Sequence, residues 1–77
     1  MDKREFVNAI FSEREIEFRY KGINYVISKN KNKFAFYSIN NYDIKLYNTP
    51  KELLENMIID DRNILDIIEN VTDIKVM

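Results

Sequence analysis

The sequence predicts a small α+β domain in which helices cover one face of an antiparallel β-sheet. Its expected order is an N-terminal helix, a three- or four-stranded antiparallel β-meander, two short C-terminal helices and a possible short final strand. Apolar residues follow helical spacing at the start of the chain and again in its last third, whereas between residues 15 and 47 they alternate with polar residues. The chain is 77 residues long, which is enough for one small core. We therefore expect a single domain over residues 1–77.

The first predicted element is a helix over residues 2–13, DKREFVNAIFSE. Phe6, Val7, Ile10 and Phe11 are three or four positions apart and form one apolar stripe. We expect this stripe to pack against the sheet.

A β-hairpin follows, because the apolar period changes from about four residues to two. Ile16, Phe18 and Tyr20 alternate with charged residues, and the only glycine lies in the next dipeptide, Lys21-Gly22. A two-residue loop at 21–22 places Tyr20 opposite Ile23, Phe18 opposite Tyr25 and Ile16 opposite Ile27. Turn chemistry and alternation agree, so this hairpin is the most firmly predicted.

Two further turns are predicted at residues 29–33, KNKNK, and at Asn40-Asn41. The register of the strand at 42–48 stays open. A tight loop at 40–41 puts Ile44 and Leu46 on the face of Ala35, Tyr37 and Ile39, with Phe34 and Phe36 opposite. A three-residue loop instead buries Phe34 and Phe36. In both cases one set of large side chains has to pack against something else or stay exposed.

The last third predicts two short helices and a possible final strand. Thr49-Pro50-Lys51-Glu52 has the signature of a helix start, with Thr49 as N-cap and Glu52 three residues later. Asp60 or Asp61 is expected to cap the second helix, and residues 73–77 could form a strand. The buried stripes of the two helices are Leu53, Leu54, Met57 and Ile58, and then Ile64, Leu65, Ile67, Ile68 and Val71.

The composition excludes several kinds of active site. The chain has no histidine and no cysteine, so triads, histidine acid–base catalysis and Cys/His zinc sites are excluded. One glycine cannot form a phosphate-binding loop. Asp60, Asp61 and Asp66 could ligate a cation, but helix capping and solvation explain them better. We expect no enzyme activity, no metal and no cofactor.

No apolar run is long enough to span a membrane, and residues 1–11 lack the apolar segment of a signal peptide. We therefore expect a cytoplasmic protein without membrane partners.

Charge is divided unevenly along the chain. Residues 1–51 hold ten Lys/Arg and six Asp/Glu, whereas residues 52–77 hold two and seven. The acidic third could imitate a phosphate backbone and bind a basic groove, although a solubilising helix face is the simpler interpretation. Its candidate contact residues are Glu52, Glu55, Asp66 and Glu69, and Phe36 and Tyr47 of the sheet are candidate apolar anchors.

A second candidate surface is the lysine-rich turn. Lys29, Lys31 and Lys33 could contact phosphates while neighbouring aromatic residues stack on bases. The alternative is a solvated hairpin tip whose lysines protect a sheet edge. The net charge of −1 disfavours direct nucleic-acid binding.

The layout of "EIEFRYKGINYVIS", "KFAFYSI" and "TPKELLENMIIDDRNILDIIENV" resembles small proteins of unknown function carried by phages and mobile elements of low-GC bacteria. The likeness covers most of the chain and departs at Asp61, where a glycine is expected in the turn. Acidic phage proteins of this size, anti-CRISPR proteins among them, act by binding. The resemblance implies such a role and transfers no functional residue.

We therefore expect a non-enzymatic, phage-type protein that inhibits a bacterial macromolecule, such as a CRISPR-type defence nuclease, by occluding a basic surface. Its partner would be a bacterial protein or nucleoprotein complex in the host cytoplasm, bound by a monomer or homodimer. The alternatives are a nucleic-acid-binding accessory protein that uses residues 29–33 and a structural protein that self-associates through its sheet.

Overall fold

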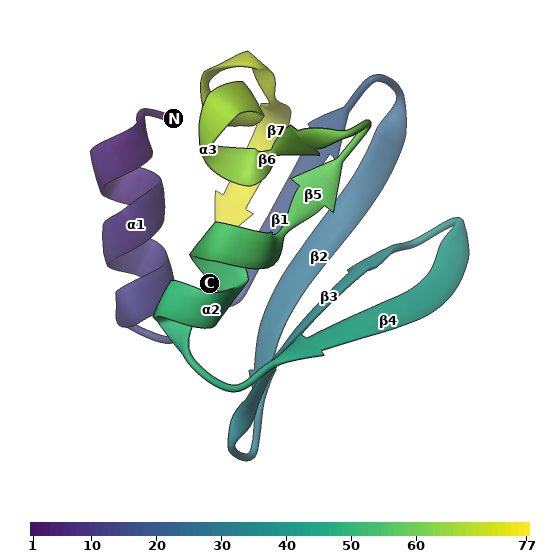
Figure 1. The fold of residues 1–77 in the computed structure, drawn as a ribbon. Coiled ribbons are helices and arrows are strands. Elements are labelled where there is room, and N and C mark those ends of the chain that lie inside the picture. The colour runs from purple at the N-terminus through teal and green to yellow at the C-terminus, as the bar shows by residue number, and fades with distance from the viewer.

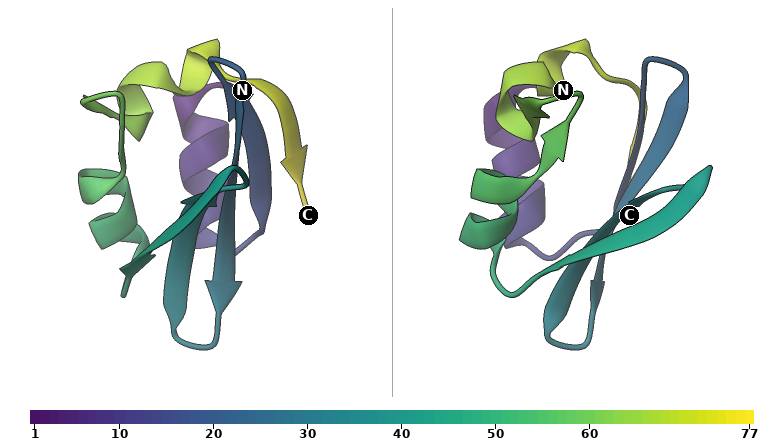
Figure 2. Two further views of the ribbon diagram at one scale, coloured as in Figure 1. Left: turned by 90° about the vertical axis from the view of Figure 1, so that its right-hand side faces the viewer. Right: turned by 45° about the vertical axis from the view of Figure 1, so that its right-hand side comes forward.

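The structure is a computed structural model that describes residues 1–77 apart from the side chain of Tyr42. A layer of helices lies against one face of a five-stranded antiparallel sheet, which confirms the predicted α+β class (Figures 1 and 2). In chain order the elements are α1 (Lys3–Phe11), β1 (Ile16–Tyr20), β2 (Ile23–Asn30), β3 (Lys33–Ser38), β4 (Asn41–Tyr47), α2 (Pro50–Asn56), β5 (Ile58–Ile59), β6 (Arg62–Asn63), α3 (Ile64–Ile67), the 3₁₀ helix η1 (Ile68–Asn70) and β7 (Thr72–Val76).

The strands β1 to β4 form the predicted antiparallel meander. The tail predicted as a possible strand is β7, which pairs antiparallel with β1 and extends the sheet to the order β4-β3-β2-β1-β7. The chain therefore leaves the sheet at β4, builds the helical layer and returns to the opposite edge. This path leaves β4 and β7 as the two edge strands.

Helix α1 begins where the sequence predicts. The Asp2 side chain accepts a hydrogen bond from the backbone N–H of Glu5 at 2.8 Å, which is a standard N-cap. Phe6 and Ile10 are fully buried, but Phe11, predicted for the same stripe, is exposed because the helix ends there.

The first hairpin has the predicted register. Tyr20 pairs with Ile23, Phe18 with Tyr25 and Ile16 with Ile27. Both turn residues have positive φ, 50° at Lys21 and 79° at Gly22, as a two-residue hairpin loop of this kind requires.

The register of β3 and β4 has features of both predicted alternatives, the tight loop at 40–41 and the three-residue loop. Ala35 lies opposite Leu46, as the tight loop predicts, but the turn occupies residues 39–40 and the pairing shifts between Phe36 and Ser38. Phe34 and Phe36 nevertheless face the helices. The reason is that β2 fixes the orientation of β3, because Ile27 of the inner face lies opposite Phe36.

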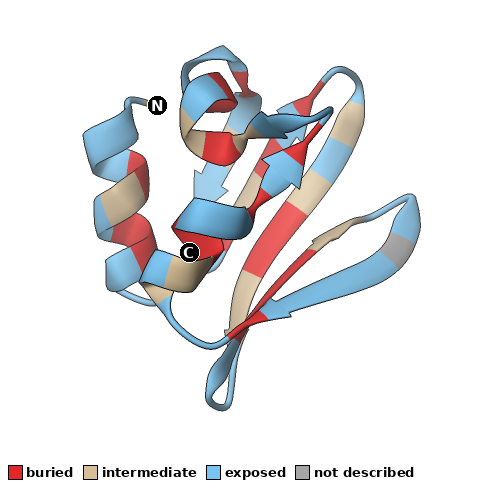
Figure 3. Ribbon diagram, in the orientation of Figure 1, coloured by how far each residue is buried: buried red, intermediate tan, exposed pale blue. Residues whose placement is uncertain are grey.

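The inner face of the sheet carries an aromatic row across three strands. The rings of Phe18 and Tyr25 stack with centroids 5.4 Å apart, and those of Tyr25 and Phe36 stack at 5.6 Å. Figure 3 shows the buried residues on this face and on the inward sides of the helices. Phe34 and Phe36, the aromatic residues whose side was ambiguous in the sequence, are therefore buried in the core.

Helix α2 has the predicted cap, since Thr49 Oγ1 accepts a hydrogen bond from the N–H of Glu52 at 3.1 Å. Leu53, Leu54 and Met57 are buried as expected. Ile58 is not part of this stripe, because the helix ends at Asn56 and Ile58 is exposed on the short strand β5.

The expected capping role of Asp60 or Asp61 is wrong. Both residues form the loop of a small hairpin between β5 and β6, with φ of 54° and 62°. The cap of α3 is instead Asn63, whose Oδ1 accepts a hydrogen bond from the N–H of Leu65 at 2.9 Å. Strands of two residues are too short to show an alternation of apolar and polar residues. Asp60-Asp61 was therefore interpreted as a helix start.

Candidate functional site

The residues that could bind a basic partner lie on the helical layer. Glu52 and Glu55 belong to α2, Asp66 to α3 and Glu69 to η1. We call these four residues the acidic helical face. Glu52 is half-buried and the other three are exposed. Asp66 and Glu52 lie in the first turns of their helices, where a negative charge is favoured by the helix dipole.

A single side chain joins the two helices that carry this face. Asn63 Nδ2 donates to the backbone oxygens of Leu54 and Glu55, at 2.9 and 3.3 Å, while its Oδ1 caps α3. The C-terminal end of α2 is thereby held at the N-terminal end of α3. The carboxylates of the two helices are consequently carried by one connected unit.

The acidic helical face is not neutralised within the molecule. Among the described side chains, ion pairs join Lys21 to Asp60, Lys29 to Glu13, and Lys45 to Asp43. No member of the acidic helical face takes part in these pairs. Residues 48–71, which build this layer, hold six Asp/Glu and two Lys/Arg. The layer therefore has a net charge of −4, and one of its carboxylates, Asp60, is paired with Lys21 of the sheet.

The predicted aromatic anchors are not available on the surface. Phe36 and Tyr47 are only 6% and 7% exposed, because both side chains face the helices. The Tyr47 hydroxyl donates to the backbone oxygen of Asn56 at 3.4 Å and so fastens β4 to α2. Burial, and to a smaller extent the charge of Glu52, raises the pKa of Tyr47 above its ordinary value. These residues support the helical layer from beneath.

An apolar residue that the sequence assigned to the core instead lies on the helical layer. Ile58 is 49% exposed and pairs across the small hairpin with Asn63, the residue that holds α2 to α3. Its neighbour Ile59 is buried, so strand alternation turns Ile58 outward. The only sequence feature that could have indicated this short strand is the pair Ile58-Ile59, and the helical spacing of apolar residues explains that pair equally well.

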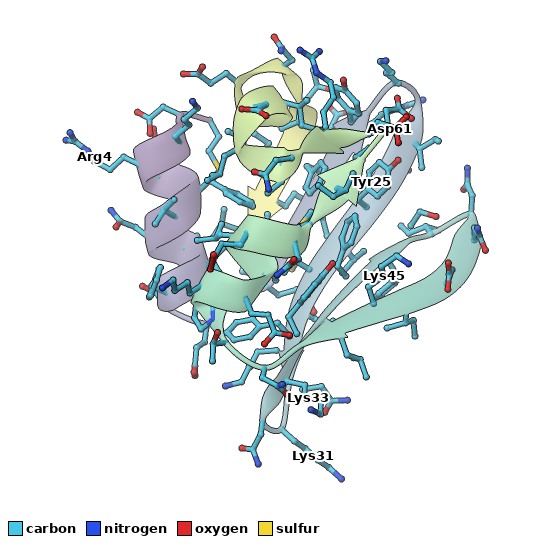
Figure 4. All side chains as sticks on the ribbon, viewed as in Figure 1. Arg4, Tyr25, Lys31, Lys33, Lys45 and Asp61 are labelled. Atoms are coloured by element: carbon cyan, nitrogen blue, oxygen red, sulfur yellow. The ribbon has the colours of Figure 1, made fainter. Side chains whose placement is uncertain are left out.

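The three lysines of residues 29–33 do not act as one group. Lys29 is half-buried, bonds Glu13 at 2.8 Å and lies 5.2 Å from the ring centre of Phe34. Lys33 donates to Asn48 Oδ1, and Lys31 is in the turn. Figure 4 shows Lys31 and Lys33 at the β2–β3 tip. The basic finger is thus reduced to two lysines.

Two hairpin loops meet on another side of the molecule. Lys21 Nζ lies 3.2 Å from Asp60 Oδ2, and this hydrogen bond raises the pKa of Lys21. Burial raises the pKa of the Tyr25 hydroxyl, and the charge of Asp60 adds to the effect. Asp61 is labelled at the tip of the small hairpin in Figure 4. Asp60 therefore serves as an ion-pair partner between loops.

Two further properties bear on what these surfaces can do. Within the described part of the chain, no three acidic side chains come together in a way that could hold a metal ion. None of the described helices has the length and apolar character needed to cross a membrane.

Comparisons of this chain with protein-family models, with curated proteins and with solved structures gave no match. The surfaces described above are therefore the basis for a functional proposal.

Proposed function

We propose that this protein is a non-enzymatic binding protein of the phage or mobile-element type, which inhibits a bacterial macromolecule by covering a basic surface. A CRISPR-type defence nuclease is the kind of target we have in mind, because such enzymes hold nucleic acid in positively charged channels. The acidic helical face would occupy the place of the phosphate backbone.

The observation that carries this proposal is the unpaired state of the acidic helical face. Carboxylates with internal lysine or arginine partners would lose those partners on binding, and that loss would offset part of the gain. Here Glu55, Asp66 and Glu69 are exposed, and none of them joins an ion pair among the side chains that the structure describes. They are also carried by helices that Asn63 holds together, so little ordering is required on binding.

Ile58 provides the apolar contact that the buried aromatics cannot. It is exposed on the same layer, next in the fold to the residue that joins α2 and α3. Interfaces commonly combine an apolar centre with a charged rim. We propose Ile58 as that centre and the acidic helical face as its rim.

The test is affinity capture from the lysate of a low-GC bacterium with three forms of the tagged protein. Asp66→Lys/Glu69→Lys reverses the acidic helical face, and Glu15→Lys/Asp43→Lys makes the same change in net charge outside the helical layer. We expect the wild type and the control to retain a basic, nucleic-acid-binding protein that the first variant loses. Circular dichroism establishes that all three forms are folded.

Retention of the same proteins by all three folded forms would contradict the proposal. Release of nucleic acid alone from the wild type would favour the accessory-protein alternative instead. That alternative has less support in the structure because Lys29 is already paired with Glu13.

A further inference from the structure

A groove lies on the face of the sheet that the helices leave open. Its volume is about 520 Å³, and it is lined by Ala35 of β3, Ile44 and Leu46 of β4, and the lysines Lys31 and Lys33 of the β2–β3 tip. We call it the lysine groove. Phe34 and Phe36 face the helices, so the alternation of β3 turns Ala35 to this open side.

The described floor of the lysine groove is aliphatic, and its two β4 side chains are accessible whereas Ala35 is buried. Ile44 is 52% exposed and Leu46 is 58% exposed, although both follow the alternation of a well-formed strand. Leu46 lies directly opposite Ala35, so the two side chains form one apolar strip across β3 and β4. Exposed apolar side chains gathered in a groove with a polar rim are typical of a binding surface.

The rim of the groove is positively charged. No described ion pair involves Lys31 or Lys33. Lys33 donates to Asn48, but that amide is neutral and leaves the lysine charge uncompensated. The groove therefore joins two free positive charges to an aliphatic floor.

Strand β4 sets the direction of the groove's floor. It is the terminal strand of the sheet, and its pairing with β3 is regular over residues 45–47. An extended segment that lies over this floor turns alternate side chains toward it and the others toward the rim. Leu46 lies in the middle of this stretch.

We propose that the lysine groove binds an extended acidic peptide segment in which carboxylates alternate with aliphatic side chains. The aliphatic side chains would pack on Ile44 and Leu46 above the buried Ala35, and the carboxylates would reach Lys31 and Lys33. This site is independent of the acidic helical face, since it lies on the opposite side of the sheet from the helices. The protein could then hold two partners at once.

The same features argue against two other ligands. Single-stranded nucleic acid needs aromatic platforms for its bases, whereas the floor here is aliphatic and Phe34 is buried on the other face. A membrane surface is best met by a protruding apolar face, whereas Ala35 lies at the base of a groove and is almost fully covered.

The experiment measures fluorescence anisotropy of a short labelled peptide in which glutamate alternates with valine. We expect saturable binding with a Kd below about 1 mM. In Lys31→Glu/Lys33→Glu the affinity should fall by about tenfold or more. Leu46→Ser should weaken binding at unchanged charge. The matched control, Lys3→Glu/Lys51→Glu, changes two exposed lysines of the helical layer and should bind like the wild type.

Three further probes complete the test. A peptide alternating lysine with valine, an oligodeoxythymidine and phosphatidylserine vesicles should all fail to bind at the groove. Binding of any of these in preference to the acidic peptide overturns the proposal, as does the absence of peptide binding. Equal loss of binding in the groove variant and the matched control overturns it too, because it would indicate an unspecific charge effect.

Discussion

The two faces of this sheet show opposite uses of its large side chains. The inner face buries Phe18, Phe34 and Phe36 under the helices, whereas the open face exposes Ile44 and Leu46 beside two lysines. Charge follows a similar division. Residues 16–47, which form β1 to β4, carry a net charge of +4, and residues 48–71 of the helical layer carry −4.

This comparison shows that aromatic content is a poor guide to the working surfaces of this protein. Most of the described aromatic side chains stabilise a small core, and the surfaces that we propose for partners are a carboxylate layer on one side and an aliphatic groove on the other. A domain of this size has little excess stability, so it buries most of its largest apolar side chains, with Phe11 as an exception at 58% exposed.

The largest expected effect is the difference in stability loss between a variant on the inner face and a variant on the open face of the sheet. Phe36→Ala should lower the free energy of unfolding by about 3 kcal/mol or more, because it leaves a cavity in the core. Leu46→Ala on the open face should change it by less than about 0.5 kcal/mol. Urea unfolding followed by circular dichroism measures both. Similar losses in the two variants would mean that the open face is covered in solution.

A second pair of variants compares two of the hairpin loops that contain residues of positive φ. Gly22→Ala should destabilise the protein by about 1 kcal/mol, because the added Cβ meets no neighbour and the cost is purely one of backbone conformation. Asp61→Gly should stabilise it by roughly 0.5 kcal/mol, since glycine relieves a φ of 62°.

Thermal unfolding of the two loop variants beside the wild type gives these differences. A destabilising Asp61→Gly would show that the Asp61 side chain makes a stabilising contribution that outweighs its backbone strain.

The smallest expected effect is a pH dependence of the stability, which arises from Tyr47 on the inner face of the sheet. The pKa of Tyr47 is raised in the folded protein above its ordinary value of 10.0. The unfolded chain therefore loses this proton first, and stability should be complete below pH 10 and fall as the pH rises toward the folded pKa. Tyr47→Phe should make the alkaline decline shallower.

Urea midpoints of the wild type and of Tyr47→Phe, measured from neutral pH upward, provide this comparison. An unchanged alkaline slope in Tyr47→Phe would assign the effect to Tyr25, whose pKa is also raised.

The parts of the fold that the sequence predicts are those where two local signals agree. At Lys21-Gly22 the turn residues and the flanking alternation specify the same register, and at Thr49-Pro50 the cap and the apolar stripe specify the same helix start. The final strand was also anticipated, although its pairing with β1 depends on contacts over more than fifty residues.

The parts that sequence reasoning missed depend on tertiary structure. Ile58 continues the helical spacing of Leu54, yet α2 ends at Asn56 and a two-residue strand begins. The burial of Phe36 follows from its pairing with Ile27 in another hairpin. The engagement of Lys29 by Glu13 joins two segments whose proximity no local pattern specifies.

The candidate surfaces, like the fold, were predicted only in part. The carboxylates of the acidic helical face were identified from composition and helix spacing, because exposed charges require only local information. The shared face of Ala35, Ile44 and Leu46 was one of two alternatives, and the structure has it. The exposure of Ile58 was not predicted, because helical spacing assigned this residue to the buried stripe of α2.

Occlusion of a basic surface is the central claim, and competition with nucleic acid tests it most directly. The measurement is the displacement of labelled nucleic acid from the captured partner by increasing amounts of this protein. The account predicts full displacement by the wild type and by Glu15→Lys/Asp43→Lys, and at least about tenfold weaker displacement by Asp66→Lys/Glu69→Lys. A stable ternary complex of protein, partner and nucleic acid would contradict it.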